Sequence, residues 1–159
     1  MTSFDDVYKI FLSKITDDMY MELTPEDTVE LLNDLLLGSL HYFEFPRQNI
    51  NDIDLDAQYF MVDLTSEEQN IIATYMIVDW LGQQLASVEN VRMKYSGSDF
   101  KFTSQANHMQ KLLQLKKDYE RMGFHLQRLY KRRKADENGI MRSTFGNIMK
   151  TIEEDWYVN

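Results

Sequence analysis

The sequence predicts a mostly α-helical protein: a helical bundle with two long helices, a small loop or hairpin insertion and an extended C-terminal arm. Three observations predict this fold class. Residues 101–134 contain no proline and one glycine, and their apolar residues recur at the 3-4 spacing of a helix that packs along another helix. Two other stretches begin with strong helix-capping sequences, at Thr24 and at Thr65. Residues 47–63 are the least helical part of the sequence.

Two helices are expected in the first third of the chain. Ser3 can cap a helix from Phe4 to about Ile15, whose apolar residues lie on one face, and residues 16–23 read as a connection. Thr24 can cap a second helix, with Pro25 at the first helical position, where its missing N–H costs nothing. This second helix is apolar on more than one face, which predicts that it is buried on two sides.

The second helix should end at Tyr42 or Phe43, because the residue before Pro46 avoids the helical region. Residues 47–63 then form an irregular loop with one small hairpin, and Tyr59–Val62 is a candidate strand. The loop carries Asp52, Asp54 and Asp56 in the Asp-x-Asp-x-Asp order that opens a calcium-binding loop. Ala57 stands where that loop requires glycine, and position 63 is Asp instead of Glu. A solvated acidic loop is therefore the preferred interpretation.

Thr65 and Glu68 form a capping box, and the helix that follows is apolar almost all round. We expect it to be the central core helix and to give way to a connection over residues 86–98. Trp80 on this helix is either a core residue or a subunit-interface anchor. Asp79 is expected on the single solvated stripe, with a buried and paired Asp79 as the alternative.

The long helix over residues 101–134 has an apolar stripe that predicts its packing face. The stripe consists of Leu112, Leu115, Tyr119, Met122, Leu126 and Leu129. Gly123, in mid-helix, predicts close packing of a neighbouring side chain, with a hinge as the alternative. Lys131–Lys134 suit the last turn of a helix. We divide the chain into a helical domain, residues 1–135, and a C-terminal arm, residues 136–159, which starts with a turn at Glu137-Asn138-Gly139.

The charge is distributed unevenly. The net charge of −9 combines a net −11 in residues 1–63, from 14 acidic and 3 basic side chains, with a net +8 in residues 101–134, from 10 basic and 2 acidic side chains. Such asymmetry predicts that the two regions meet, either within one molecule or head to tail between copies in a ring.

No catalytic signature is present, and we predict no enzymatic activity and no cofactor or metal. The absence of cysteine excludes disulfides and thiolate chemistry. His108 and His125 lie too far apart on the long helix to share a metal ion. The basic cluster over residues 128–134 could contact nucleic acid, but the net charge of −9 on the whole molecule argues against specific nucleic-acid binding. With no signal peptide and no apolar run long enough for a membrane, a soluble protein of the reducing cytoplasm is expected.

Two local patterns carry a resemblance. One runs from Phe60 through Leu64-Thr65-Ser66-Glu67-Glu68 to Asp79-Trp80-Leu81, and the other from Ser98 to His108 with the charged helix behind it. Over residues 58–134 the chain resembles small virion proteins of tailed bacteriophages, of the head–tail connector (neck or adaptor) kind. The resemblance transfers no catalytic residue.

The resemblance implies a homo-oligomeric ring of twelve copies in the virion neck, made in the host cytoplasm and joining capsid to tail. The expected partners are the portal protein and other neck or tail proteins, with DNA passing nearby and no membrane contact. The expected interface residues are Trp80, Tyr119, Arg128, Tyr130, Arg132, Arg133, Phe145, Ile148, Trp156 and Tyr157, and Asp52, Asp54 and Asp56 are expected to face the channel. The alternative is a cytosolic helical adaptor or regulatory protein that binds another protein through its long helix.

Overall fold

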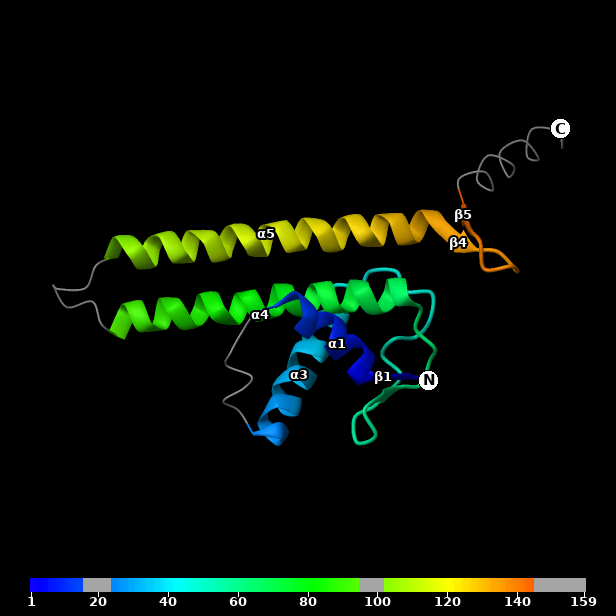
Figure 1. Ribbon diagram of the computed structural model, residues 1–159, viewed down its shortest axis with the longest axis horizontal. Helices are drawn as coiled ribbons and strands as arrows, with labels where there is room; N and C mark the ends of the chain where they lie inside the picture. The colour runs from blue at the N-terminus through cyan, green and yellow to red at the C-terminus, as the bar shows by residue number, and fades with distance from the viewer. Residues whose placement is uncertain (16–23, 95–101, 145–159) are drawn as a thin grey trace, which may run out of the picture.

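A computed structural model of the chain describes residues 1–15, 24–94 and 102–144. This part is mostly helical, with small antiparallel sheets, as the sequence predicts (Figure 1). Its elements are β1 (Thr2–Ser3), α1 (Phe4–Lys14), α3 (Pro25–Leu40), β2 (Ile53–Asp54), β3 (Tyr59–Phe60), α4 (Ser66–Lys94), α5 (Phe102–Arg132), β4 (Arg133–Ala135) and β5 (Met141–Ser143). The predicted connection over residues 16–23 lies outside the described residues.

Helix α4 is the middle layer of the molecule. In Figure 1, α5 runs along one side of α4, while α1 and α3 lie on its other side. The two turns from Ile71 to Val78 are buried all round, which confirms the predicted central core helix. Phe4, Phe11 and Leu36 are fully buried with them. The apolar core therefore lies mainly between α4 and the α1–α3 layer.

Three helix starts follow the capping pattern of the sequence. The Ser3 hydroxyl accepts a hydrogen bond from the Asp5 amide at 3.3 Å, and the Thr24 hydroxyl accepts from the Asp27 amide at 3.2 Å. At the start of α4, the Glu68 carboxylate accepts from the Thr65 amide at 2.8 Å. The Glu68 amide donates in return to the Thr65 hydroxyl at 3.3 Å, so the predicted capping box is confirmed.

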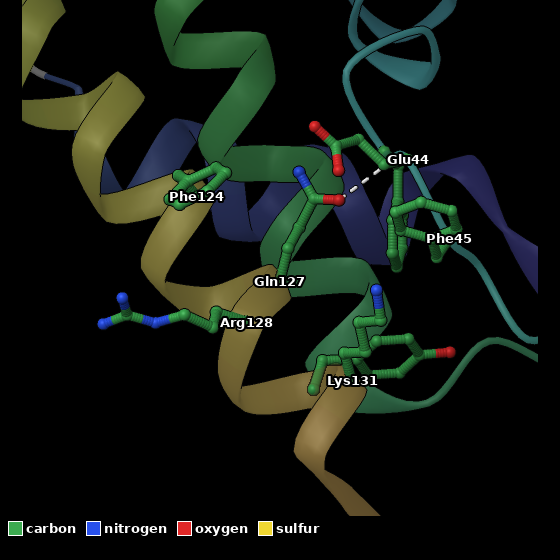
Figure 2. A pocket seen from close by; sticks show the side chains of 8 residues that line it. Glu44, Phe45, Phe124, Gln127, Arg128 and Lys131 are labelled. Carbon is green, nitrogen blue, oxygen red and sulfur yellow. Dashed lines mark hydrogen bonds between the residues drawn. The ribbon is translucent and has the colours of Figure 1, made fainter.

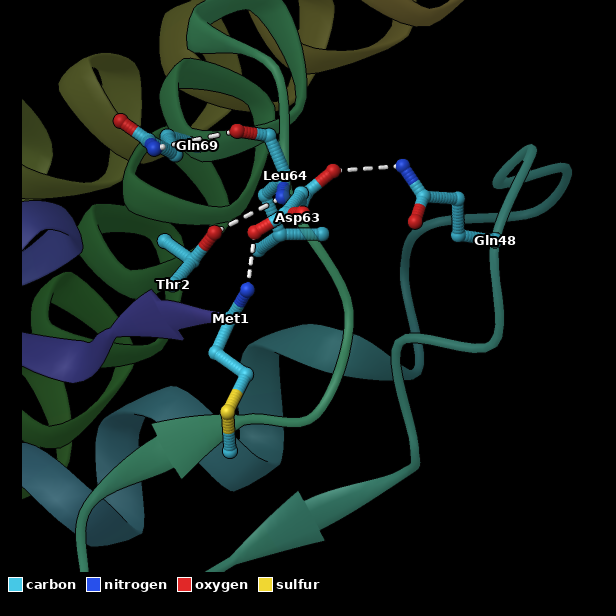
Figure 3. Close-up of polar contacts among 6 residues, drawn as sticks. All are labelled: Met1, Thr2, Gln48, Asp63, Leu64 and Gln69. Atoms are coloured by element: carbon cyan, nitrogen blue, oxygen red, sulfur yellow. Dashed lines mark hydrogen bonds and ion pairs between the residues drawn. The ribbon is translucent and has the colours of Figure 1, made fainter.

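The loop between α3 and α4 is tied to the N-terminus by a small sheet. Its strand order is β1-β3-β2, both pairs are antiparallel, and Phe60 pairs with Thr2 on one side and Ile53 on the other. Figure 3 shows the contacts beside it: the Leu64 amide donates to the Thr2 hydroxyl at 2.8 Å, and the Met1 amino group pairs with Asp63. The Gln48 and Gln69 side-chain amides donate to the Asp63 and Leu64 carbonyls at 2.5 and 3.3 Å. The predicted hairpin exists, but the sequence analysis missed β1.

Two predicted boundaries were wrong. Helix α4 continues to Lys94, so residues 86–94 are helical and not a connection. Helix α5 ends at Arg132, and Arg133 begins β4, so the last turn of α5 does not extend to Lys134. The chain then turns through residues 136–140, where Gly139 has φ +75° and its amide donates to the Asp136 carbonyl at 2.9 Å. The turn is the one predicted at Glu137-Asn138-Gly139, and the predicted domain boundary at 135/136 falls inside this β4–β5 hairpin.

Candidate protein-binding surfaces

The face that α5 presents to α4 differs in part from the predicted stripe. Leu112, Tyr119 and Leu126 pack against the core as expected. In contrast, Leu115 and Met122 are 44% and 48% exposed. The contact face is completed by Lys116, Gly123 and Gln127, which lie between the apolar members of the stripe, and by Tyr130, which follows its last member. Two of the six residues of the apolar stripe are therefore exposed on one flank of the helix, and Leu129 is half-buried.

Gly123 allows close packing, as the sequence predicts. A Cβ atom built at this position would lie 2.7 Å from Cζ of Tyr75 and 3.0 Å from its hydroxyl oxygen. Tyr75 in turn stacks on Tyr42, with ring centroids 5.2 Å apart and planes at 10°. The missing side chain thus lets the Tyr75 ring fit between α4 and α5.

Gln127 joins the end of α3 to both long helices. Its side-chain carbonyl accepts from the Glu44 amide at 2.8 Å, and its NH₂ group donates to the Tyr42 carbonyl at 2.8 Å and the Tyr75 hydroxyl at 2.6 Å. The side chain is 9% exposed, so these hydrogen bonds satisfy polar groups that have little access to water. Sequence reasoning did not single out Gln127, because a lone glutamine on a charged helix carries no pattern.

Tyr130, a predicted interface residue, is buried inside the chain at 2% exposure. Its hydroxyl donates to the Glu68 carboxylate at 2.5 Å and accepts from the Arg47 amide at 3.0 Å. The Arg47 guanidinium lies 3.9 Å above the Tyr130 ring and donates to the Tyr130 carbonyl at 2.6 Å and to the Arg133 carbonyl. Burial, and next the Glu68 carboxylate, raise the pKa of Tyr130 well above its usual value, so the hydroxyl stays protonated as the donor.

A hollow of about 150 Å³ opens beside this junction, between the loop after α3 and the last turns of α5 (Figure 2). We call it the aromatic hollow; it is lined by Phe43, Glu44, Phe45, Phe124, Gln127, Arg128, Tyr130 and Lys131. Phe45 and Phe124 are 61% and 57% exposed, which is high for such large apolar side chains. The Lys131 amine lies 4.3 Å from the centroid of the Phe45 ring.

The other predicted interface residues lie in different settings. Trp80 is half-buried against the core, and its indole N–H has no hydrogen-bond partner among the residues that the structure describes. Tyr119 is half-buried on the α4 face of α5, whereas Arg128 and Arg132 are exposed. Arg133 forms an ion pair with Glu67 at 2.8 Å. Phe145, Ile148, Trp156 and Tyr157 lie outside the described residues.

Asp79 occupies the alternative position that the sequence analysis left open. It is half-buried against α3, where a Cβ built on Gly38 would lie 2.4 Å from its carboxylate oxygen. Burial raises the pKa of Asp79, while a hydrogen bond from Tyr42 and the charge of Lys116 act in the opposite direction. The expectation of a solvated Asp79 was therefore wrong. The half-buried carboxylate lies against Gly38 of α3, accepts a hydrogen bond from Tyr42 and lies in the field of the Lys116 charge.

The predicted acidic loop residues are exposed. Asp52, Asp54 and Asp56 all face solvent, and the Asp54 carboxylate accepts from the Ala57 amide at 2.9 Å. Within residues 1–15, 24–94 and 102–144, no group of three or more His, Asp or Glu side chains is placed to hold a metal ion. Nor does any helix in these ranges have the length and apolarity to cross a membrane.

Opposite charges cover the two outer sides of the molecule. The acidic face, on α1 and α3, consists of the exposed residues Asp5, Asp6, Glu26, Asp27, Glu30 and Asp34. The basic face, on α5, consists of the exposed residues Lys111, Lys117, Arg121, Arg128, Lys131 and Arg132. The helices that carry the two faces lie on opposite sides of α4, α5 on one side and α1 and α3 on the other. For the side chains that the structure describes, no ion pair joins the two faces.

Comparisons with protein-family models, with curated proteins and with solved structures give no match. Function is therefore inferred from two surfaces of the described chain and from the local resemblance of the sequence. The first is the pair of oppositely charged faces on the two sides of α4. The second is the aromatic hollow at the end of α5, whose exposed Phe45 and Phe124 were not singled out because single aromatic residues are common in any sequence.

Proposed function

We propose that this chain is a structural, non-enzymatic protein that assembles with copies of itself. The observation that supports this proposal best is the separation of the acidic face and the basic face across α4, with no ion pair between them in the described part. Within one molecule the two faces cannot meet, so their complementarity is available to a neighbour.

The charge pattern favours head-to-tail assembly over a two-fold dimer. A two-fold contact uses the same patch on both subunits, so it would bring acid against acid or base against base. A head-to-tail contact places the acidic face of one copy on the basic face of the next. Such contacts close into a ring when the rotation per subunit fits, and otherwise continue as a filament.

The resemblance to head–tail connector proteins of tailed phages suggests where this assembly would occur. We propose a ring of twelve copies in the virion neck, below the portal, that joins capsid to tail. The exposed Asp52, Asp54 and Asp56 supply negative charge that, facing the channel, would let DNA pass without sticking. Residues 1–135 would form the ring body, with residues 136–159 as an arm.

One observation favours the second candidate, a cytosolic helical adaptor. Leu115 and Met122 form an exposed apolar flank on α5, one helical heptad apart. An amphipathic helix of another protein could pack on this flank beside the basic face. In this case the chain would bind its partner as a monomer and would form no ring.

Light scattering, first of the protein alone and then with candidate portal proteins, tests the proposal. At low salt, the protein alone or its mixture with a portal protein should have a mass well above 18.9 kDa. The assembly should dissociate as added salt screens the charges at the contact. The double variants Glu30→Lys/Asp34→Lys and Lys117→Glu/Arg121→Glu should each abolish assembly, whereas Glu137→Lys, in the β4–β5 turn, should not. The ring proposal would be contradicted if the mass stays at 18.9 kDa in every sample, or if the charge reversals leave the mass of the assembly unchanged.

A further inference from the structure

We infer that the aromatic hollow binds the C-terminal segment of the same chain, residues 145–159. The hollow presents two exposed aromatic rings, Phe45 and Phe124, around a space of about 150 Å³. In another protein, a cavity of this size admits benzene, so the space suits a single aromatic ring. A surface of this kind is typical of a site that another side chain covers.

Charge points to the identity of that side chain. Arg128 and Lys131 line the hollow and both are exposed, with Arg132 in the same helical turn; Glu44 is the single acid among the lining residues. The C-terminal segment contains Glu153-Glu154-Asp155 followed directly by Trp156-Tyr157. The three carboxylates can pair with Arg128 and Lys131, and an aromatic ring next to them can pack on Phe45 and Phe124. Tryptophan is a favoured anchor residue in binding sites of this kind.

The path of the chain places the segment close to the hollow. Strand β5 runs antiparallel to β4 and so returns toward the end of α5. At its end, the Thr144 amide donates to the Arg132 carbonyl at 2.8 Å and the Thr144 hydroxyl to the same oxygen at 3.2 Å. Arg128 and Lys131 lie within about 6 Å of Arg132 along the helix axis, at about 1.5 Å per residue.

The length of the segment is sufficient for docking on its own chain. Asp155 lies eleven positions after Thr144, and this stretch can span up to roughly 35 Å, at about 3.3 Å per residue. A tether this short gives a high effective concentration at a nearby site, which favours the chain's own segment over that of a neighbour. Arg128 and Lys131 belong both to the basic face and to the hollow, but the two proposals are tested separately, because the charge reversals on α5 that test the ring lie on Lys117 and Arg121, outside the hollow.

Tryptophan fluorescence tests the inference directly. The chain has two tryptophans, so Trp80→Phe leaves Trp156 as the only one. In this variant we expect the fluorescence emission of Trp156 to be blue-shifted and to be quenched only weakly by acrylamide. Arg128→Glu/Lys131→Glu should shift the emission to longer wavelength and raise the quenching constant several-fold. The matched reversal Lys111→Glu/Lys117→Glu, elsewhere on α5, should change neither quantity.

A charge swap gives the sharpest control. Adding Glu153→Lys/Glu154→Lys to the Arg128→Glu/Lys131→Glu variant should restore the protected emission. If Trp80→Phe does not fold, the difference in quenching between the wild type and Trp156→Phe supplies the same readout. Solvent-exposed Trp156 in the unreversed protein, or protection that disappears on serial dilution and so comes from a neighbouring copy, would overturn the inference.

Discussion

The α1–α3 layer and α5 contact opposite sides of α4 in different ways. Leu32, Leu35, Leu36 and Leu40 of α3 are all at most 6% exposed, and four residues of α1 are buried with them. Among the described side chains of α5, in contrast, Tyr130 is the only buried apolar one, and the contact depends on Gly123, Gln127 and Tyr130. One side is held by fully buried apolar side chains. The other combines the half-buried Leu112, Tyr119 and Leu126 with directional contacts of Gln127 and Tyr130 near one end of the helix.

The difference indicates how stability is distributed. Apolar burial is non-directional and spread over many residues, so the α1–α3 side should contribute most of the free energy of unfolding. Hydrogen bonds between buried groups add less on average but are costly to break. The α5 side should therefore depend on a small number of residues, and its outer surface is free to carry charge for assembly.

The largest effect is expected on the α1–α3 side. Leu36 is fully buried, so Leu36→Ala should lower the free energy of unfolding by about 3 kcal/mol through lost transfer energy and a residual cavity. Urea denaturation followed by circular dichroism measures the loss. Leu12→Ala, on the exposed side of α1, serves as the control and should cost much less. Equal losses for the two variants would show that this layer is loosely packed.

A smaller but still substantial loss is expected at the junction with α5. Gln127→Leu leaves the Glu44 amide, the Tyr42 carbonyl and the Tyr75 hydroxyl without a partner, and should cost about 2 kcal/mol. Gln110→Leu, at an exposed position of the same helix, should stay within about 0.5 kcal/mol of the wild type. If both variants are neutral in urea denaturation, directional contacts do not hold α5.

Two glycine substitutions should change stability in opposite directions. Gly123→Ala places a Cβ against the Tyr75 ring, and overpacking of this kind costs about 1–3 kcal/mol, more than the gain of about 1 kcal/mol in helix propensity. At Gly82, a Cβ would meet only the Lys116 side chain, at 3.6 Å, so Gly82→Ala should stabilise by up to about 1 kcal/mol. Thermal melting compares them, and a stabilising Gly123→Ala would contradict the packing described here.

The smallest effect concerns Asp79. Burial raises its pKa in the folded protein above the usual value of 3.8, so the unfolded chain releases this proton at lower pH than the folded chain. The contribution of Asp79 to stability is therefore greatest below pH 3.8 and falls as pH rises through the folded pKa. Asp79→Asn should remove this part of the pH dependence and stabilise at neutral pH by less than about 1 kcal/mol, because solvent screens the half-buried group. A lower stability at neutral pH would show that the charged form is favoured.

Much of the fold could be predicted from local signals. The caps at Ser3, Thr24 and Thr65 fix where three helices begin, and the continuous apolar run after Thr65 identifies the core helix. The end of α4 was missed because its apolar residues lose helical periodicity after residue 85. Strand β1 was missed because it is only two residues long, too short to show the alternation of apolar and polar residues that marks a strand.

The candidate surfaces were harder to predict. The face of α5 was predicted from its apolar residues, but Leu115 and Met122 turn outward while Lys116, Gly123 and Gln127 face α4. A polar or glycine position in a helix interface leaves no trace in hydrophobic periodicity. The charge asymmetry was visible in the sequence, but its placement on opposite sides of α4 depends on the fold.

The central claim, that the acidic and basic faces pair between copies, is tested most directly by mixing two reversed variants. Glu30→Lys/Asp34→Lys puts two positive charges into the acidic face, and Lys117→Glu/Arg121→Glu puts two negative charges into the basic face, so each variant alone should lose attraction at the contact and remain monomeric. In an equimolar mixture the reversed face of one variant can contact the reversed face of the other, so that the introduced Lys and Glu side chains again pair opposite charges. Light scattering should then recover the mass of the wild-type assembly. A mixture that remains at 18.9 kDa under conditions where the wild type assembles would contradict the claim.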